Sequence, residues 1–346
     1  MNEGGRFSDA TAALGLDRFS SRWNGITTGD FNEDGLPDIV ATSWGRNTRF
    51  RPDSAHPVML YYADFDGNGT MDVVEAQYDA RLKAVAPLRG FLGLTLGIPD
   101  VGRRIGSFRA YADASVRDVL GPAATGASVL QMNGLAHTLF LSRDGGFDAV
   151  ELPGEAQLAP AFYAGVADFN GDGHDDLFLT QNFFSTEVGT RYDAGRGLWL
   201  SGDGRGGLTP VAGGVSGVKV YGDQRGAALA DFDADGRVDL VVSQNANRTV
   251  LYRNRGGKPG LRVRLIGTPE NPHAFGATLR LVYGGERGPG REVHAGSGYW
   301  SQDGPVQVLG MRQQPTAVWV RWPDGGEATV AVPEGARELV VTAAAR

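Results

Sequence analysis

The chain has 346 residues, of which 41% are hydrophobic, 21% charged and 9% aromatic, a composition that excludes a disordered protein. It contains no cysteine, which excludes disulfides, thiolate zinc sites and cysteine nucleophiles, so any bound metal must use oxygen or imidazole ligands. The net charge of −7 argues against a nucleic-acid partner, no apolar run is long enough to span a membrane, and no signal peptide is visible.

Four segments share one nine-residue pattern, D-F-[DN]-x-[DN]-G-x-x-D, and they occupy residues 30–38, 64–72, 168–176 and 231–239. Side-chain oxygens at positions 1, 3, 5 and 9, a backbone carbonyl at position 7 and a bend-forming glycine at position 6 suit a hard cation. The pattern predicts about four calcium sites. The predicted ligands are Asp30, Asn32, Asp34, Leu36 and Asp38; Asp64, Asp66, Asn68, Thr70 and Asp72; Asp168, Asn170, Asp172, His174 and Asp176; and Asp231, Asp233, Asp235, Arg237 and Asp239.

The residues on either side of these loops favour strands. The second loop, with Glu75, fits the EF-hand expression, but an EF-hand needs a helix on each side of the loop. Here the strand-like segments VMLYYA and MDVVEA flank the loop, so we reject an EF-hand. Glycine-rich turns end further expected strands at 139–147, 198–208 and 250–257. The G-x-G-x-x-G run at 202–207 is interpreted as one of these turns, because no helix follows it to bind a pyrophosphate.

The loop pattern is absent between about residues 80 and 125. Apolar residues there recur at helical spacing until Gly121 and Pro122 end the run, namely Phe108, Tyr111, Ala112, Val116, Val119 and Leu120. The spacing predicts a small helical insertion. The alternative is a degenerate repeat in which the same residues lie on strands.

The loops and their expected strands resemble the FG-GAP or VCBS repeats of integrin-α-like β-propellers, over residues 1–258. The resemblance implies an all-β fold, a calcium-stabilised propeller with the insertion at about 80–125. The length suffices for four or five blades, whereas propellers of this type usually close with seven. Closure would therefore need missing blades, unusual blades or self-association.

Residues 259–346 resemble the ASPIC and UnbV domain, on the ordered segments NPHAFGATLRLVYGG, REVHAGSGYWSQ, VQVLGM and AVWVRWPDGGEATV. Alternating apolar residues at 317–322 and the turn residues at 323–326 independently predict a strand and a hairpin. We expect a small β-sandwich-like domain here, after the propeller.

No catalytic constellation is recognisable in the sequence. The five histidines are scattered, and Ser297 with His294 lacks both the G-x-S-x-G elbow and an orienting acid. The FG-GAP resemblance implies a non-catalytic binding or adhesion module for a protein or glycan partner, in the extracellular or cell-surface setting that calcium loops favour.

The UnbV resemblance leaves an alternative open, a cytoplasmic protein of enediyne-type natural-product biosynthesis. Such a protein would bind or transform a small apolar substrate at a propeller face covered by the insertion. The residues that could line that pocket are Arg103, Arg104, Arg109, Tyr111 and Tyr192. A deep pocket would favour the small molecule, and a flat face would favour a protein or glycan.

Overall fold

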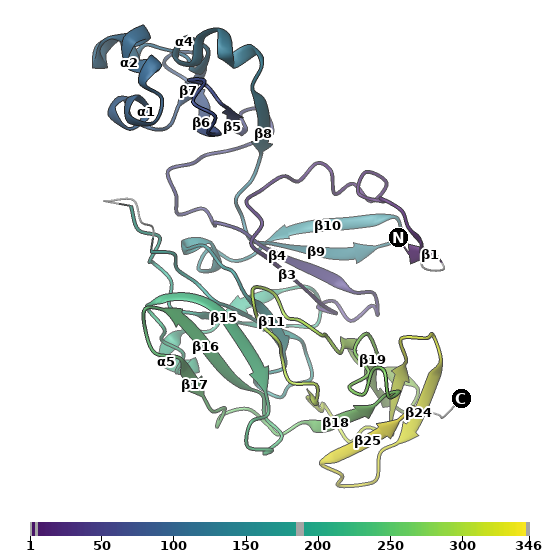
Figure 1. Ribbon diagram of the computed structural model, residues 1–346. Coiled ribbons are helices and arrows are strands. Elements are labelled where there is room, and N and C mark those ends of the chain that lie inside the picture. Colours follow the sequence, from purple (N-terminus) through teal and green to yellow (C-terminus); the bar gives the residue numbers. More distant parts are fainter. Residues whose placement is uncertain (1, 4–5, 185–189, 344–346) are drawn as a thin grey trace. The chain divides into compact units, whose positions relative to one another are not determined.

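The computed structural model describes residues 2–3, 6–184 and 190–343, and it is mostly β (Figure 1). The chain divides into two compact units, of which the second is inserted into the first. The first unit comprises Met1–Leu16, Trp23–Asn47 and Ala136–Arg346, and the second comprises Asp17–Arg22 and Thr48–Leu135.

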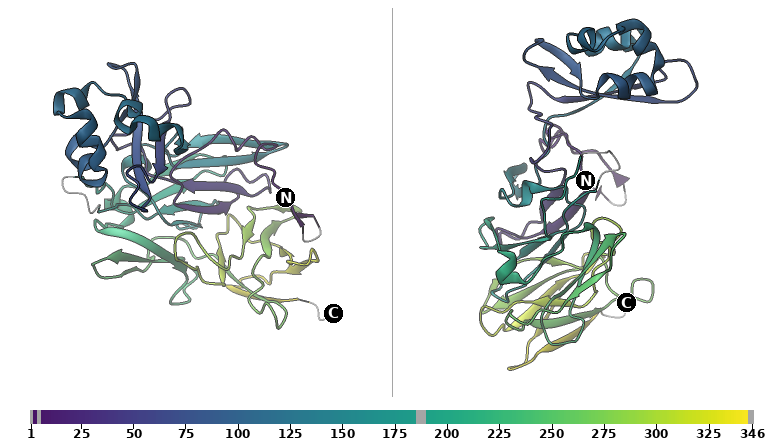
Figure 2. Two further views of the ribbon diagram at one scale, coloured as in Figure 1. Left: turned by 45° about the horizontal axis from the view of Figure 1, so that its top comes forward. Right: turned by 90° about the vertical axis from the view of Figure 1, so that its left-hand side faces the viewer.

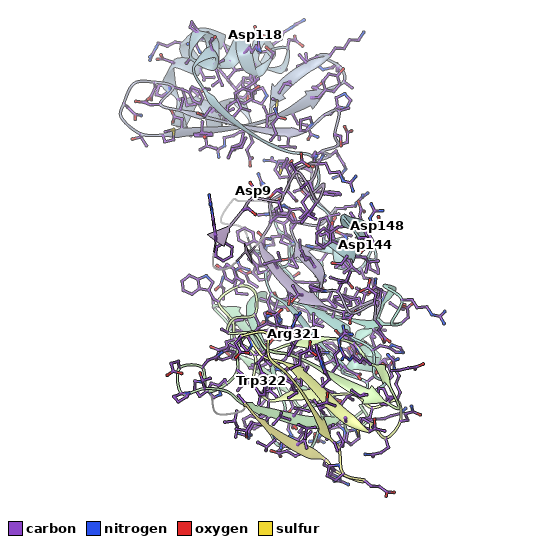
Figure 3. The ribbon with its side chains drawn as sticks, turned by 90° about the vertical axis from the view of Figure 1, so that its right-hand side faces the viewer. Asp9, Asp118, Asp144, Asp148, Arg321 and Trp322 are labelled. Carbon is purple, nitrogen blue, oxygen red and sulfur yellow. The ribbon has the colours of Figure 1, made fainter. Side chains whose placement is uncertain are left out.

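The second unit is an antiparallel sheet packed against short helices. Its strands run in the order β7-β6-β5-β8. The elements are β5 (Val58–Ala63), β6 (Asp72–Asp79), β7 (Ala84–Pro87), α1 (Phe91–Gly97), α2 (Pro99–Ile105), α3 (Phe108–Ala112), α4 (Val116–Leu120), the 3-10 helix η1 (Gly121–Thr125) and β8 (Ser128–Met132). Ser115 and Asp118 form a capping box that starts α4, on which Asp118 lies (Figure 3).

The core of this unit joins the helices to the sheet. Leu94, Val101 and Val119 on the helices pack with Tyr61 and Val74 on the sheet. The apolar residues that predicted a helix therefore lie on α3 and α4, and not on strands. The inserted unit is larger than the predicted 80–125 segment, because it also contains a sheet whose edge strand β8 pairs with the distant β5.

The first unit contains three further antiparallel sheets in succession, in the orders β10-β9-β4-β3, β11-β12-β13-β14 and β15-β16-β17. Their strands are β3 (Gly25–Gly29), β4 (Asp38–Thr42), β9 (Thr138–Arg143), β10 (Gly146–Glu151), β11 (Ala164–Ala167), β12 (Asp176–Leu179), β13 (Leu198–Gly202), β14 (Leu208–Pro210), β15 (Asp223–Ala230), β16 (Asp239–Asn245) and β17 (Val250–Tyr252). Smaller elements are β1 (Asn2–Glu3), β2 (Arg6–Phe7), η2 (Ala156–Leu158) and α5 (Gly213–Ser216).

Each acidic loop joins the first two strands of one sheet. The four loops connect β3 to β4, β5 to β6, β11 to β12 and β15 to β16, and position 9 is in every case the first residue of the second strand. Strands on both sides agree with the rejection of EF-hands. The 202–207 run forms the turn between β13 and β14, where the Asp203 N–H donates to the Gly207 carbonyl (3.1 Å).

The sheets of the first unit pack in series, with β11 beside both β3 and β15. Phe31 and Val40 of the first sheet share a core with Leu177 and Leu200 of the second. A separate core joins the second sheet to the third through Phe169, Phe178 and Leu240. Phe31 and Phe169, each at position 2 of its loop, therefore pack against the core of the following sheet.

The C-terminal region forms two sheets (Figure 2). They enclose one core, which includes Leu261, Leu279 and Val318. One sheet has β18 (Leu261–Ile266), β22 (Gln307–Leu309) and β25 (Glu338–Thr342); the other has β19 (Thr278–Tyr283), β20 (Glu286–Arg287), β21 (Arg291–Glu292), β23 (Ala317–Arg321) and β24 (Glu327–Ala331). The strand and hairpin predicted at 317–326 are confirmed by the pairing of β23 with β24.

A loop of the C-terminal region, residues 294–304, is hydrogen-bonded to the first strands of the sheets. The Asp303 carboxylate accepts from the Tyr163 hydroxyl (2.8 Å) and from the Leu229 N–H (2.8 Å). The Ser297 hydroxyl accepts from the Asp303 N–H (3.2 Å), so this serine helps to hold the loop. The C-terminal region and the sheets are thereby joined into one unit.

Candidate metal centres

The four acidic loops share one backbone conformation. The N–H of position 2 donates to the position 9 carboxylate at 2.9–3.0 Å, in Phe31–Asp38, Phe65–Asp72, Phe169–Asp176 and Phe232–Asp239. The position 6 glycine has φ between 83° and 91° and donates to the position 1 carboxylate, in Gly35–Asp30, Gly69–Asp64, Gly173–Asp168 and Gly236–Asp231. Position 7 donates to position 5, in Leu36–Asp34, Thr70–Asn68, His174–Asp172 and Arg237–Asp235. Backbone donors thus orient the side-chain oxygens of every loop.

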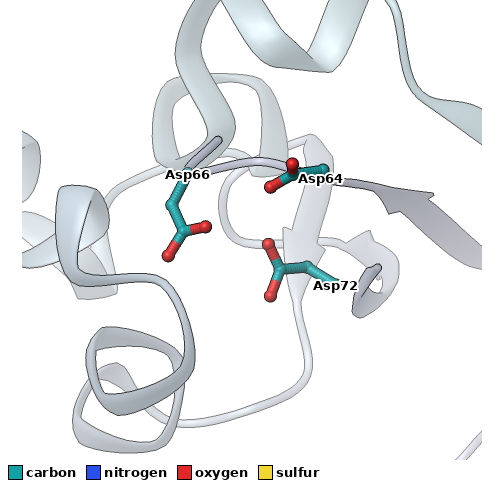
Figure 4. Close-up of side chains that lie close together, drawn as sticks. All are labelled: Asp64, Asp66 and Asp72. Atoms are coloured by element: carbon teal, nitrogen blue, oxygen red, sulfur yellow. The ribbon is translucent and has the colours of Figure 1, made fainter. Parts of the chain in front are cut away.

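In two of the loops, three carboxylates converge. One oxygen from each of Asp64, Asp66 and Asp72 lies within 4.8 Å of the others (Figure 4). The same holds for the second cluster, Asp231, Asp233 and Asp239. Two like charges 4 Å apart repel by about 1 kcal/mol in water and by about 4 kcal/mol at an effective dielectric constant of 20. A bound cation would relieve this repulsion.

The second cluster also has an unsatisfied acceptor. Oδ1 of Asp233 is buried and has no hydrogen-bond partner among the described residues, although Oδ2 pairs with Arg253. A buried polar atom without a partner costs about 1–3 kcal/mol. Three carboxylates with one free buried oxygen form a hard donor set, which fits Ca²⁺ better than a soft metal.

The loops at 30–38 and 168–176 have asparagine at position 3. The side-chain amide of Asn32 donates to Asp34 (2.9 Å), and that of Asn170 donates to Asp172 (2.8 Å). A neutral amide at this position lowers the negative charge of the loop, but its oxygen can still coordinate a cation.

The carboxylates at positions 1 and 9 of these two loops are buried. Burial raises the pKa of Asp38 to about 6, that of Asp168 to about 6 and that of Asp176 to about 7. Burial also raises the pKa of Asp30. A cation in the loop would favour the ionised carboxylates and so counteract this effect of burial.

Position 9 also ties the loop to its own sheet. The other oxygen of Asp38 accepts from the Ser142 N–H of β9 (2.7 Å) and that of Asp176 from the Gly202 N–H of β13 (2.9 Å). Asp239 accepts in the same way from Asn254, just after β17. These bonds connect the geometry of a loop to the pairing of the third strand.

The C-terminal region covers position 1 in the three loops of the first unit. Arg280 Nη2 lies 3.0 Å from Asp30 Oδ2, and Arg262 Nε lies 2.7 Å from Asp231 Oδ2. Gly310 approaches Asp168 so closely that a Cβ at this position would overlap the carboxylate. The sequence pattern contains no signal for these contacts, because the partners are far apart in the chain.

A further cluster links two neighbouring loops. His174 Nδ1 lies 2.6 Å from Glu33 Oε1, and Arg312 pairs with Glu33 and donates to the Gly173 carbonyl (3.0 Å). The loop at 30–38 and the loop at 168–176 are therefore held together by one residue of the C-terminal region.

The predicted ligand-pocket residues belong to both units. Four lie on α2 and α3 of the second unit, and the fifth lies in the first: Arg103, Arg104, Arg109, Tyr111 and Tyr192. Arg104 donates to the Val119 carbonyl (2.7 Å) and the Tyr111 hydroxyl to the Arg89 carbonyl (2.5 Å), so both support the helical layer. The ligand-binding role of these residues stays a prediction.

Comparison with known proteins gives two family matches. Residues 168–242, which include two of the acidic loops, match the FG-GAP-like repeat family, and residues 267–346 match the ASPIC and UnbV family. The chain is also 33% identical over 115 residues to cartilage acidic protein 1 of Xenopus tropicalis.

That alignment covers 32% of this chain and 18% of the relative, so the chain matches only a small part of the curated protein. None of the helices in the described ranges has the length and apolar character needed to cross a membrane. The chain thus combines an FG-GAP-like repeat region with a C-terminal region of the ASPIC and UnbV family.

Proposed function

We propose that the chain is a calcium-stabilised binding module in which the four loops each hold a calcium ion. The observation that carries this proposal is the Asp231, Asp233 and Asp239 cluster with its buried, unpartnered Asp233 oxygen. The FG-GAP match supports it, because repeats of this family generally bind calcium. A site with a dissociation constant near 0.1 mM contributes roughly 1.4 kcal/mol of stability at about 1 mM calcium. Such concentrations favour an extracellular setting.

We also propose that three sheets of the first unit, β10-β9-β4-β3, β11-β12-β13-β14 and β15-β16-β17, are successive blades of an incomplete propeller. Their first strands lie side by side, and Phe31 and Phe169 each pack under the next sheet. The exception supports this interpretation: Phe232 of the last sheet is 71% exposed, whereas Phe31 is 2% exposed. A further blade, from this protein or from a second copy, would cover Phe232.

The partner of this module would be a protein or a glycan, and the protein alternative is in keeping with the protein interactions that FG-GAP domains generally mediate. An aromatic surface in the first unit supports this choice. It comprises the exposed Trp300 and the half-buried Trp44, Phe183 and Tyr299, which pack with one another or on the buried Phe162 and Tyr192. Aromatic residues and arginine are enriched at the energetic centres of interfaces.

Packed aromatic rings surround one exposed side chain of the aromatic surface. Tyr299 packs on Phe162 (5.3 Å between ring centroids), and the Arg225 guanidinium lies 4.4 Å from the centre of the Phe162 ring. Trp300 is 91% exposed and has φ of 49°, a left-handed conformation that is costly for a bulky residue. A strained, solvent-exposed tryptophan is better explained by contact with a partner than by folding.

Calcium titration by isothermal calorimetry tests the metal sites. We expect about four calcium ions per chain and about three in Asp233→Ala, whereas Asp233→Asn keeps the site because Asn occupies this position in two other loops. Asp148→Ala is the matched control, since Asp148 is an exposed carboxylate on β10 (Figure 3). Unchanged stoichiometry in Asp233→Ala, or no calcium uptake by the wild type, would contradict the proposal.

Binding to immobilised extracellular glycans and matrix proteins tests the aromatic surface. Trp300→Ala should weaken binding by about 30-fold, the loss typical of an interface hot spot, without lowering the melting temperature. Val340→Ala, which removes an exposed apolar side chain from β25, should bind as the wild type does. Equal affinity of both variants would refute the role of Trp300.

A further inference from the structure

A cavity of about 450 Å³ lies between the second and third sheets of the first unit. This volume is within the range of about 300–1,000 Å³ that is usual for small-molecule sites. The second sheet has four strands and the third has three. After β17 the chain turns inward, where the Lys258 N–H donates to the Asn170 carbonyl (2.9 Å), so no fourth strand fills the space beside β17.

The walls of the cavity are apolar and well packed. They include Phe169, Phe178, Trp199, Val218, Leu240 and Tyr252. All six belong to, or pack against, the core shared by the second and third sheets. The Trp199 ring meets Phe169 edge to face at 5.9 Å between centroids, which fixes one wall. A preformed apolar wall binds a ligand without a large ordering cost.

The polar groups of the cavity are cationic or neutral. Arg253 and Arg255 line it, and the described lining contains no aspartate or glutamate. Arg253 pairs with Asp233, whereas Arg255 is exposed and forms no ion pair with any described residue. The Tyr252 hydroxyl accepts the Lys219 N–H (3.2 Å) and retains its own proton for donation. These groups complement an anion at one end of an apolar molecule.

We propose that this cavity is a binding site for a small aromatic or branched apolar anion, such as an aromatic carboxylate. The apolar body would lie against Trp199 and Leu240, and the anionic group would pair with Arg255. A compact ligand fits better than an added peptide strand, because the free edge of β17 has only three residues and Val215–Val218 also border the cavity. The cavity borders two acidic loops through Phe169, Asn170 and Val238. The proposed ligand would pair with Arg255 and with no loop carboxylate, so the inference goes beyond the proposed function.

The test uses two fluorescent probes on the full chain in about 2 mM calcium. 8-Anilinonaphthalene-1-sulfonate has the apolar body and the anion, and N-phenyl-1-naphthylamine has the body alone. We expect saturable binding of both with one site per chain. Arg255→Gln should weaken the sulfonate by about fivefold, equivalent to about 1 kcal/mol, and leave the neutral probe unchanged.

A second variant locates the apolar body. Trp199→Phe keeps an aromatic wall but should strongly reduce energy transfer from tryptophan to the bound probe, whereas Trp300→Phe, at an exposed position, should not. The proposal is overturned if the sulfonate binds without saturation, if Arg255→Gln binds both probes as the wild type does, or if energy transfer depends equally on the two tryptophans. Displacement of the probes by the extended peptide Val-Thr-Val-Thr-Val, with no effect of Arg255→Gln, would instead assign the cavity to strand addition. Because Arg255 is exposed, that variant decides the question even if Trp199→Phe fails to fold.

Discussion

Replacement of the loop phenylalanine by alanine should destabilise the protein to very different extents in two loops of the same pattern. Phe31 and Phe232 both occupy position 2, and each backbone N–H donates to the position 9 aspartate at 2.9 Å. Their side chains differ, because Phe31 is 2% exposed and Phe232 is 71% exposed. The comparison therefore separates side-chain packing from the loop hydrogen bonds.

The expected magnitudes follow from these environments. Phe31 packs with Val40 of its own sheet and with Leu177 and Leu200 of the next, so Phe31→Ala creates a cavity in a closed core. Such a truncation costs about 3–5 kcal/mol of unfolding free energy. Phe232→Ala removes a mostly solvated ring and should cost no more than about 0.5 kcal/mol.

Urea denaturation followed by circular dichroism, at fixed calcium concentration, measures both values. Calcium affinity should be unchanged in both variants, because neither ring is a ligand and both backbone donors remain. Equal destabilisation would refute the reasoning. A large loss for Phe232→Ala alone would mean that its ring is covered in solution, and light scattering would then show whether a second copy covers it.

Three further predictions concern buried polar contacts. Arg262→Gln leaves Asp231 without its cationic partner and should cost about 3 kcal/mol in chelator but less in saturating calcium, as measured by denaturant titration in both conditions. Gly310→Ala forces a methyl group onto the Asp168 carboxylate and should lower stability by about 1–3 kcal/mol; a melting temperature equal to the wild type would contradict this. Burial lowers the pKa of His137 from 6.5 to about 4, so its contribution to stability is fully present above pH 6.5 and is lost as the pH falls toward 4. The stability difference between wild type and His137→Gln should shrink by about 2–3 kcal/mol between pH 7 and 4.5, and a constant difference would disprove the assignment.

Local sequence determined the parts of this protein whose partners lie close in the chain. The acidic loops were predicted correctly as strand-flanked turns, because the glycine, the backbone donors and the side-chain acceptors all lie within nine residues. The helices at 108–120 followed from apolar spacing and from Gly121, which ends the run. The C-terminal hairpin at 317–326 followed from alternation and from its turn residues. Each of these features is encoded by hydrogen bonds and side-chain periodicity over a few residues.

The tertiary structure alone decided which of these equivalent loops are buried, clustered or covered. No local pattern distinguishes Phe31 from Phe232, because the difference is the presence of a following sheet. Arg262 and Arg280 reach loop aspartates that are 31 and 250 residues away in the chain. The cavity beside Trp199 is lined by residues of the loop at 168–176, of β13 and of the segment after β17, which only the fold brings together. Packing between distant segments sets burial and charge neutralisation, and a one-dimensional pattern does not contain that information.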